Sequence, residues 1–359
     1  MAFLDVTQWD DLQITGATNE KRFSELGLVD AVKASTPATA EFIPPSAREA
    51  LRVASASRAV KIPVIKDQTV VVETTPGFNF IPDNLPETDE YSFTAFDVFS
   101  GFRHFPAAYA NNVVDANFAR DQVMKNVAYA MGNSIETILA AQLETRKSQL
   151  LNFTTQVSQG DGTFTFNGGT DTLEVNKAAQ KETMFSNLNT LMSANELEGT
   201  YRIATNRAGM AVQRTEAAKF GAANDKDLQN LMFFGNDRIH ESGNISAGSD
   251  IFNGWLIRDG SIGMVENFPW DFTNGTEING KKWNITNMEL PFTGMRANVY
   301  TNSEATEATS LISPATDSNL IMTHFEEMAI WIRFYVVYRF NSDLANRAQD
   351  IVKIKGLIT

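Results

Sequence analysis

Three histidines, His104, His240 and His324, are the residues best suited to acid–base or metal chemistry, and each stands alone in the sequence. No two of them have the spacing of a metal-ligand pair, and a lone histidine is more often structural than a ligand. The nearest acid–base cluster is Asp237, His240 and Glu241, which the surrounding pattern places on a solvated face beside a strand. We therefore expect no metal site, no cofactor and no catalytic residue here.

Other patterns that carry chemistry are equally scarce. Glu326 and Glu327 form a carboxylate pair only in the sequence, because adjacent residues on a strand point to opposite faces. The sequence has no glycine-rich phosphate loop, no nucleophile elbow and no His-Glu-x-x-His motif. It has no cysteine, which excludes disulfides, thiolate catalysis and thiolate metal sites. We expect a protein that is not an enzyme; a cytosolic α+β enzyme with a site assembled from scattered residues stays open as an alternative.

The charge and composition limit the partners. The chain has 359 residues, enough for two cores, and 43% hydrophobic residues with 25 Phe exclude disorder as its main state. A net charge of −13 repels the phosphate backbone, so no surface that reads DNA is expected. Neither a basic–apolar leader nor a run of 18 apolar residues is present, which predicts a soluble chain made in a cytoplasm, without a membrane partner.

Residues 1–56 have the composition of an arm. Ala34–Ala40 and Ile43–Ser46 are small and interrupted by proline, and only Glu20–Ala34 and Ser46–Ala56 could hold short helices. The segment is either a flexible tail or an extended arm ordered across neighbouring subunits. The arm is favoured because such contacts would offset the entropy lost on ordering.

Residues 57–110 predict a β-ribbon. Val60, Ile62 and Val64 alternate with their neighbours, a strand period, and Pro63 confines this strand to an edge or a two-stranded ribbon. A proline-containing loop over Thr75–Pro86 precedes a returning strand, Tyr91–Phe99, with Tyr91, Phe93 and Ala95 on one face. We expect the ribbon to stand off the body.

The longest helical pattern runs from Asn111 to about Leu151, or roughly 60 Å over about 41 residues. Its apolar stripe needs a partner, for which we expect a sheet. The stripe consists of Val123, Val127, Met131, Ile135, Ile138, Leu139 and Leu143, and the polar residues placed off it are Asp121, Lys125, Glu136, Glu144 and Lys147.

The rest of the chain reads as mixed α and β structure. The strongest strand is Ile330–Phe340, whose two faces alternate, and a last strand is expected at Ile351–Ile354 after a turn at Asn341–Gln349. The other expected elements are a hairpin at Phe153–Phe166 closing at Asn167–Gly169 or around Gly160–Gly162, helices at Glu174–Ala194 and Asn206–Phe220, a strand at Tyr201–Ala204, tight turns at Asn253, Asn274 and Asn279, and a surface loop at Thr301–Ser318.

This order of elements resembles the major capsid proteins of tailed phages. The stretches that look similar are Lys61–Asp67, Asp115–Leu143, Tyr201–Asn206 and Trp331–Lys355. The resemblance implies an α+β, Hong Kong 97-type capsid fold with five parts. These are an N-terminal arm (1–56), the extended β-ribbon or E-loop (57–110), a P-domain with a long spine helix (111–200), an A-domain (201–320) and a return to the P-domain (321–359).

The resemblance also implies the function. Such a chain would assemble with itself, as pentamers and hexamers, into the icosahedral head shell that encloses double-stranded DNA in the virion, after assembly in the host cytoplasm. Further partners would be a portal protein and decoration proteins. A separate scaffolding protein is expected because the chain starts at Met1 without a long charged helical extension. DNA would be enclosed without sequence-specific binding.

The expected subunit interface lies on the ribbon. Its apolar side chains should be poorly buried within one chain, as is typical of an interface. The interface residues are Lys61, Ile62, Val64, Lys66, Asp67, Val70, Val72 and Phe93.

Two matters stay open. Some members of the family cross-link a ribbon lysine to an asparagine, and Lys61 or Lys66 with Asn341 or Asn346 could be proposed, although nothing in the sequence marks them. An encapsulin-like nanocompartment shell protein would share the fold, but such proteins usually lack a long polar arm.

Overall fold

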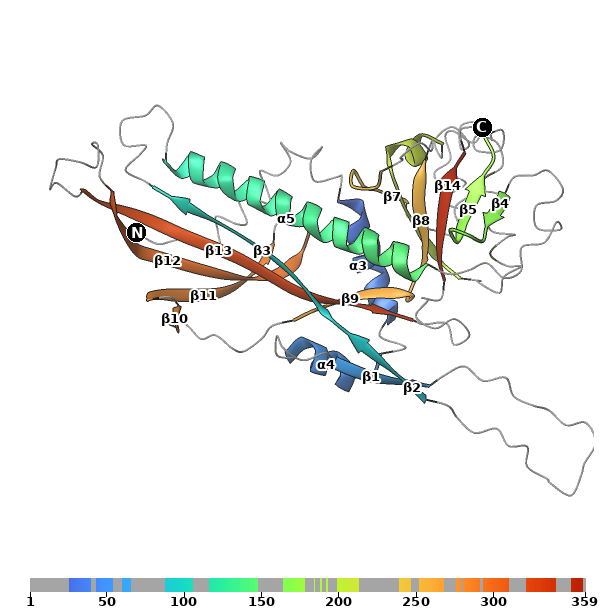
Figure 1. Cartoon of the computed structure of the whole chain (residues 1–359), viewed down its shortest axis with the longest axis horizontal. Helices are drawn as coiled ribbons and strands as arrows, with labels where there is room; N and C mark the ends of the chain where they lie inside the picture. Colours follow the sequence, from blue (N-terminus) through green and yellow to red (C-terminus); the bar gives the residue numbers. More distant parts are fainter. Residues whose placement is uncertain are drawn as a thin grey trace, which may run out of the picture.

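The computed structural model describes residues 26–39, 43–53, 60–65, 88–105, 116–147, 164–177, 184, 188, 192, 199–212, 239–246, 252–267, 276–278, 280–290, 293–309, 321–339 and 350–357. Two six-stranded sheets, a two-stranded ribbon and one long helix organise this part of the chain (Figure 1).

The first sheet is antiparallel and is built around β13 (Ile321–Tyr338), the longest strand described. Its strand order is β10-β11-β12-β13-β3, and β9 also pairs with β13. The other strands are β3 (Ala95–His104), β9 (Ile262–Glu266), β10 (Thr276–Ile278), β11 (Lys281–Leu290) and β12 (Met295–Thr309).

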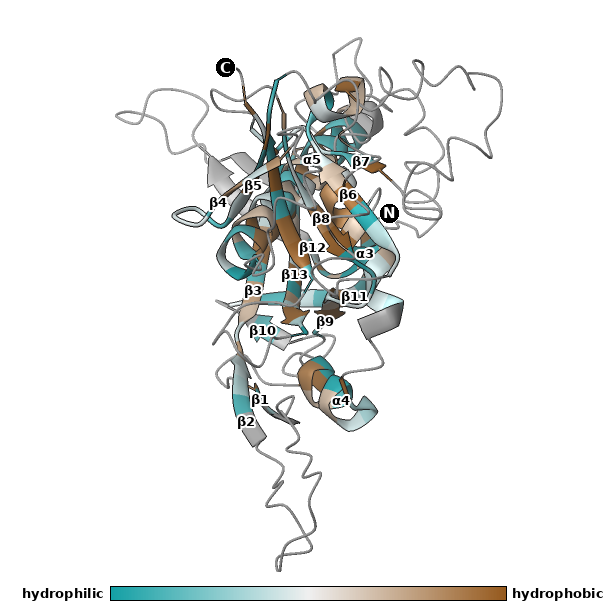
Figure 2. Cartoon of the chain, turned by 90° about the vertical axis from the view of Figure 1, so that its right-hand side faces the viewer, coloured by the Kyte–Doolittle hydropathy of each residue, from teal (hydrophilic) through white to brown (hydrophobic). Residues whose placement is uncertain are grey.

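The two faces of β13 are both used, as the alternation in the sequence predicted. Ile330, Ile332 and Phe334 lie with Val336 and Tyr338 in the main core. Tyr335 and Val337, on the opposite face, join a separate cluster with Leu51. Figure 2 shows hydrophobic residues along β13 and β9 and on one side of α4.

The long helix α5 (Ala116–Arg146) packs its buried side chains into the same core as β13 and β3. The predicted single helix over a sheet is therefore confirmed, with 31 residues. Its buried apolar residues step by three or four: Met124, Ala128, Met131, Ile135, Leu139 and Leu143. Two assignments were wrong: Val123 is 39% exposed, and Glu136, expected on the polar side, is 0% exposed.

The second sheet has the order β4-β5-β14-β8-β6-β7 and its own core. Pairing is parallel for β14 with β5 and for β6 with β7, and antiparallel elsewhere. The strands are β4 (Phe164–Asn167), β5 (Thr172–Val175), β6 (Tyr201–Thr205), β7 (Ile239–Glu241), β8 (Asn253–Arg258) and β14 (Ile351–Gly356).

The predicted arm needs correction over its described part. Helix α3 (Gly27–Thr39) buries Leu28, Val29, Ala31 and Val32 in the main core of its own subunit. Helix α4 (Pro45–Val53) buries Leu51 against β13 and β9 residues. Residues 27–53 are therefore part of the folded body, because their few large apolar side chains find a core made by distant segments.

Other local predictions were wrong for similar reasons. Asn253 begins strand β8, and its neighbour Gly254 serves close strand packing, since a Cβ there would lie 2.6 Å from the Ala204 carbonyl oxygen. The first half of the expected loop Thr301–Ser318 is strand, because β12 continues to Thr309 along β13. The Asn167–Gly169 turn does close a hairpin, but between β4 and β5.

The remaining predictions are confirmed where they are described. β6 and the helix that begins at Arg207 follow the predicted Tyr201–Ala204 and Asn206–Phe220. Gly280 lies in the turn between β10 and β11, at a φ of +75°, whereas Asn279 lies outside the described residues. Met184, Leu188 and Met192 are helical and buried, as expected for Glu174–Ala194, although β5 takes its first residues. The turns at Gly160–Gly162, Asn274 and Asn341–Gln349 lie outside the described residues.

Candidate subunit interface

The ribbon consists of β1 (Val60–Ile65) and β2 (Thr88–Phe93), which pair with each other in an antiparallel register. In the described part of the chain neither strand belongs to a six-stranded sheet. Pro63 lies within β1, as expected for a strand without a full ladder on both sides. Lys61 and Glu90 form an ion pair of 3.1 Å across the ribbon, with about two-thirds of each side chain exposed.

The ribbon is anchored to the body at its base. Phe93 is 7% exposed and belongs to a cluster with Ile43, Leu51 of α4 and Tyr335 and Val337 of β13. Phe93 was predicted to be poorly buried within one chain, and this was wrong, because its side chain anchors the base of the ribbon to the body. The ribbon also ends there, because residues from Ala95 onwards pair with β13 in the first sheet.

The other predicted interface residues are placed only in part. Lys61 is exposed, and Ile62 and Val64 take their strand positions opposite Tyr91 and Asp89. The side chains of Ile62 and Val64, and all of Lys66, Asp67, Val70 and Val72, lie outside what the structure describes. The same holds for Asn341 and Asn346 of the possible cross-link.

An exposed aromatic side chain on β3 was missed by the sequence analysis. Phe99 is 67% exposed and lies directly opposite Trp331 of β13. It shares the sheet face turned away from α5 with Asp97 and Arg333, because even-numbered residues of β3 such as Val98 pack against α5. The sequence contained a signal for this exposure, because Phe99 falls on the strand face opposite the apolar Phe96, Val98 and Phe102.

Charged pairs surround Phe99 on this face. Arg333 donates to Asp97 through Nε at 2.6 Å and Nη2 at 2.9 Å, and its guanidinium lies 4.8 Å from the Trp331 ring centre. Glu327 binds Arg103 at 3.0 Å and Lys281 at 2.8 Å. Burial raises the pKa of Asp97, but hydrogen bonds from Arg333 and Trp331 outweigh it and hold the pKa below its usual value.

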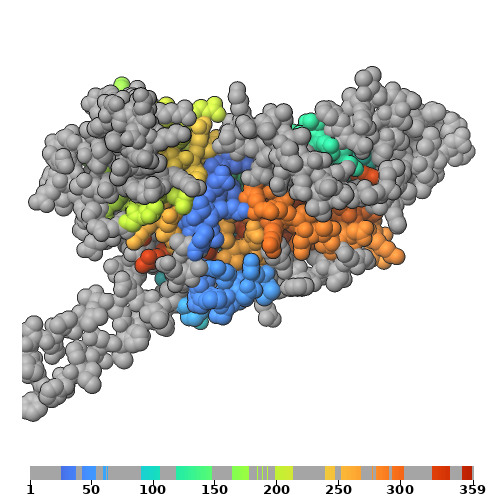
Figure 3. All heavy atoms as spheres, turned by 180° about the vertical axis from the view of Figure 1, so that it is seen from behind, coloured from blue at the N-terminus to red at the C-terminus, as the bar shows by residue number. Residues whose placement is uncertain are grey.

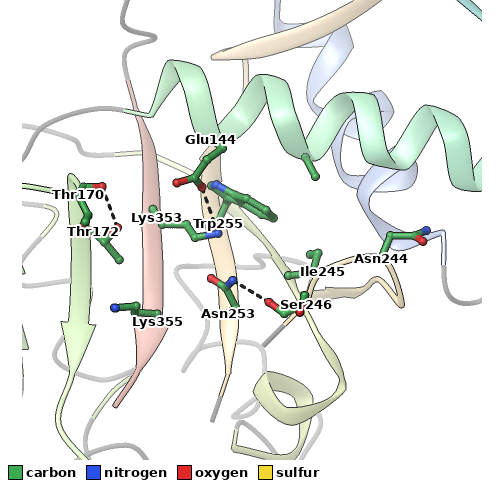
Figure 4. Close-up of a pocket in the computed structure, with 11 residues that line it drawn as sticks. Glu144, Thr170, Thr172, Asn244, Ile245, Ser246, Asn253, Trp255, Lys353 and Lys355 are labelled. Atoms are coloured by element: carbon green, nitrogen blue, oxygen red, sulfur yellow. Dashed lines mark hydrogen bonds and ion pairs between the residues drawn. The ribbon is translucent and has the colours of Figure 1, made fainter. Parts of the chain in front are cut away.

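A polar pocket of about 410 Å³ lies between the end of α5 and one face of the second sheet (Figure 4). The aromatic ring and the carboxylate that line this pocket already bind a side chain of the protein itself. The Lys353 Nζ lies 3.5 Å from the Trp255 ring centre and 3.3 Å from the Glu144 carboxylate. An aromatic face with a carboxylate is a cation site, and here Lys353 occupies it. The arrangement links β14 and β8 to α5.

The residues first considered for chemistry are dispersed. His104 lies opposite Glu326 on the α5 side of the first sheet, while His240 is in β7 of the second; the side chain of His324 and all of Asp237 lie outside the described residues. Burial lowers the pKa of His104, partly countered by Glu326. Among the described residues, no group of three His, Asp or Glu could hold a metal ion. No helix in this part of the chain is long and apolar enough to cross a membrane.

No protein-family model matches the chain, and no curated protein matches it either. Solved structures from phages are similar over most of its length. The capsid structure of the cyanophage P-SCSP1u is 11% identical, with 86% of each chain covered and a TM-score of 0.46. The bacteriophage PhiM1 mature capsid is 10% identical (84% of this chain, 83% of that chain, TM-score 0.45), and a structure of Mycobacterium phage Adephagia is 13% identical (88% and 90%, TM-score 0.43).

Proposed function

We propose that this chain is the major capsid protein of a tailed phage, a structural subunit that assembles with copies of itself into the head shell around the genome. The observation that carries this proposal is the ribbon of β1 and β2, which in the described part of the chain pairs with neither six-stranded sheet. The exposed Phe99 of β3 adds apolar surface on the neighbouring sheet. Contacts with copies of the same chain would cover both features.

The ribbon and Phe99 indicate where such contacts would form. A two-stranded ribbon is marginally stable alone in water, so β1 and β2 beyond the Phe93 root would gain by lying on another subunit. Phe99 exposes a large aromatic surface beside the Asp97–Arg333 pair, an arrangement of an apolar centre with a charged rim. The proposed interface therefore joins the ribbon residues Lys61, Ile62 and Val64 with the β3 face around Phe99.

The parts of the shell fold can be assigned as proposals on the observed elements. β1 and β2 would form the base of the E-loop, α5 the spine helix, the first sheet the P-domain, and the second sheet with its helices the A-domain. The expected parts are amended at the N-terminus, where only residues before 26 remain for an arm. Scaffolding, portal and decoration proteins are proposed as further partners, and DNA is enclosed without a dedicated reading surface.

Sedimentation velocity of the purified chain tests this function against the enzyme alternative. A shell protein gives particles of many subunits, or a subunit that converts to them when salt screens the repulsion between its negative charges. A single small oligomer at every salt concentration would contradict the proposal.

A nanocompartment shell protein is the second candidate. The predicted long arm was the feature that distinguished a phage capsid protein from such a protein, and the described part of that arm folds into the body of the subunit. The contents of the particles distinguish them. Particles from phage-producing cells should hold double-stranded DNA protected from nuclease, whereas a nanocompartment would hold protein cargo.

A further inference from the structure

Strand β3 forms one end of the first sheet. In the described part of the chain it pairs with β13 alone, over all ten of its residues and without a shift in register. The other end of the sheet is held within the subunit: Lys33 Nζ of α3 donates to the Thr293 carbonyl at 2.7 Å in the turn from β11 to β12, and Figure 3 shows α3 in blue beside these orange strands. A long regular edge strand presents a row of backbone donors and acceptors to another strand. The edge of β3 is therefore where the sheet can be extended by another chain.

The residues of β3 on the face turned away from α5 are exposed. They are Asp97, Phe99, Gly101 and Arg103, and Phe99 has 67% of its surface exposed. Gly101 has no side chain, so its exposure is that of the backbone itself. The missing Cβ has a cause within the subunit, because a Cβ there would lie 2.7 Å from the Met328 carbonyl oxygen. It also leaves a flat place on the strand, two residues from a large exposed ring.

Two opposite charges lie on this face at equal distances from Ser100. Asp97 is three residues before Ser100, and Arg103 is three residues after it. Asp97 binds Arg333 with 44% of its own side chain exposed, and Arg103 binds Glu327 at 3.0 Å with 54% of its side chain exposed. Both are therefore fixed in place by β13 and still have open surface for one more charged neighbour.

We propose that β3 pairs antiparallel with β3 of a second copy, with Ser100 facing Ser100 across a two-fold axis, so that the two first sheets become one. This rests on the proposed function, in which copies of the chain associate. Successive residues of an edge strand direct their backbone groups alternately towards and away from the new partner, so only registers that pair residues of equal parity form a ladder. Such registers also keep α5 of both copies on the same side of the joined sheet, as two subunits in one shell wall require.

The charges select one of these registers. With Ser100 at the centre, Asp97 of each copy lies opposite Arg103 of the other, and two opposite-charge pairs form across the axis. Phe99 then faces Gly101, so the exposed ring covers backbone that carries no side chain. Centring the pairing on Phe99 or on Gly101 instead would lose both charge pairs.

The face towards α5 agrees with the same register. Val98 is buried and Phe102 is partly buried in the main core of their own subunit. In the proposed pairing Val98 of each copy lies opposite Phe102 of the other, so apolar side chains meet on both sides of the axis. Neither face of the joint brings like charges together.

A single cysteine tests the pairing directly, because the chain has no cysteine of its own. Directly opposite residues in an antiparallel pair have Cα atoms about 4.5–5.5 Å apart, a separation that a disulfide can span. Ser100→Cys is nearly isosteric and should cross-link to its own copy under mild oxidation. Each chain carries one such residue, so a denaturing gel should show a dimer and no larger species, even from assembled shells.

Two matched variants place the cysteine elsewhere. Ala95→Cys lies on the same strand, but Ala95 would face Phe105 of the second copy, which sets the two Ala95 residues about 34 Å apart. Thr137→Cys lies at an exposed position of α5. Neither should give dimers. If Ser100→Cys gives no more dimer than these controls, as when the ribbon of a neighbour lies along the edge instead, the pairing is overturned.

Arg103→Ala in the Ser100→Cys background tests the register. Lys281 still binds Glu327 at 2.8 Å, so the subunit should keep its fold, which circular dichroism checks. Loss of the charge pairs should slow dimer formation from dissociated subunits, by up to about fivefold for each of the two pairs, and Arg103→Lys should restore part of the rate. An unchanged rate in Arg103→Ala would overturn the register centred on Ser100.

Sedimentation of the same samples reports shell formation independently of the gel. Shells without Ser100→Cys dimers would leave the proposed function standing and overturn the pairing of β3. Dimers without shells would support the pairing and count against the proposed function.

Discussion

Arg333 of β13 donates two hydrogen bonds to the Asp97 carboxylate of β3, from Nε at 2.6 Å and from Nη2 at 2.9 Å. The guanidinium side is almost fully buried, with 7% of the Arg333 side chain exposed against 44% for Asp97. The pair therefore fixes the edge strand β3 to the centre of the first sheet, directly beside the exposed Phe99 of the proposed interface.

Replacing the carboxylate should weaken this attachment. We predict that Asp97→Asn lowers the free energy of unfolding by about 1–3 kcal/mol, because the buried Arg333 loses its charged partner. Denaturant unfolding of dissociated subunits measures the change. Glu90→Gln, which breaks the exposed Lys61–Glu90 pair, is the matched control and should cost less than about 1 kcal/mol. Equal effects of the two variants would contradict the assignment.

Phe99 should matter for assembly and little for folding. Phe99→Ser removes an exposed ring, so we predict a free energy of unfolding within about 0.5 kcal/mol of the wild type and a clear loss of assembled particles. Light scattering after a salt jump measures assembly. Thr137→Ala, at an exposed position of α5 whose hydroxyl bonds only its own helix, is the control and should assemble normally. Normal assembly of Phe99→Ser would remove β3 from the proposed interface.

Two deletions distinguish the role of the N-terminal arm from that of the folded body. Removing residues 1–55 takes away Leu28, Val29, Val32 and Leu51, all 0% exposed, so we predict that no folded subunit is recovered. Removing residues 1–25 leaves this core whole, so the subunit should fold and any defect in assembly reports the arm alone. Circular dichroism checks folding. A folded, stable subunit without residues 1–55 would contradict the placement of α3.

Glu144 should contribute to acid sensitivity. Burial raises its pKa, but Lys147 and Lys353 outweigh that effect and the pKa is lowered. A carboxyl with a lowered pKa in the folded state supports folding above its ordinary pKa of 4.5, and this support is lost as the pH falls through the lowered value. We predict that Glu144→Gln is less stable than the wild type at pH 7 and that the two converge in acid. Thermal unfolding at pH 7 and pH 3 measures both; a constant difference would contradict this.

The sequence predicted the elements whose side chains follow a simple period. Ile330–Phe340 alternates so regularly that the residues of its two faces could be assigned before the fold was known. The α5 stripe was assigned correctly from Met131 onwards, whereas its first part lacked the buried Met124 and Ala128 and included the exposed Val123. Such patterns report burial directly, since every second or every third to fourth residue meets the same core.

The predictions that failed concern segments whose structure is set by contacts with distant parts of the chain. Ala34–Ala40 has the composition of a loop, yet α3 continues through Pro37 because Ser35 and Thr36 bind the β8–β9 region more than 220 residues away. Glu136 belongs to the polar set of α5 by residue type, and its burial is explained by donors on distant segments: the amides of Leu28 and Val29 in α3 and the side chains of Ser242 and Asn244. Neither contact has a signal in the local sequence.

Electron cryomicroscopy of assembled wild-type protein tests the central claim most directly, because it reports both the size of the assembly and the contacts within it. The account predicts closed icosahedral particles in which β1, β2 and the β3 face around Phe99 lie against neighbouring copies while α5 remains packed on the first sheet of its own subunit. A discrete small oligomer, or a shell in which the ribbon and Phe99 face solvent, would contradict it.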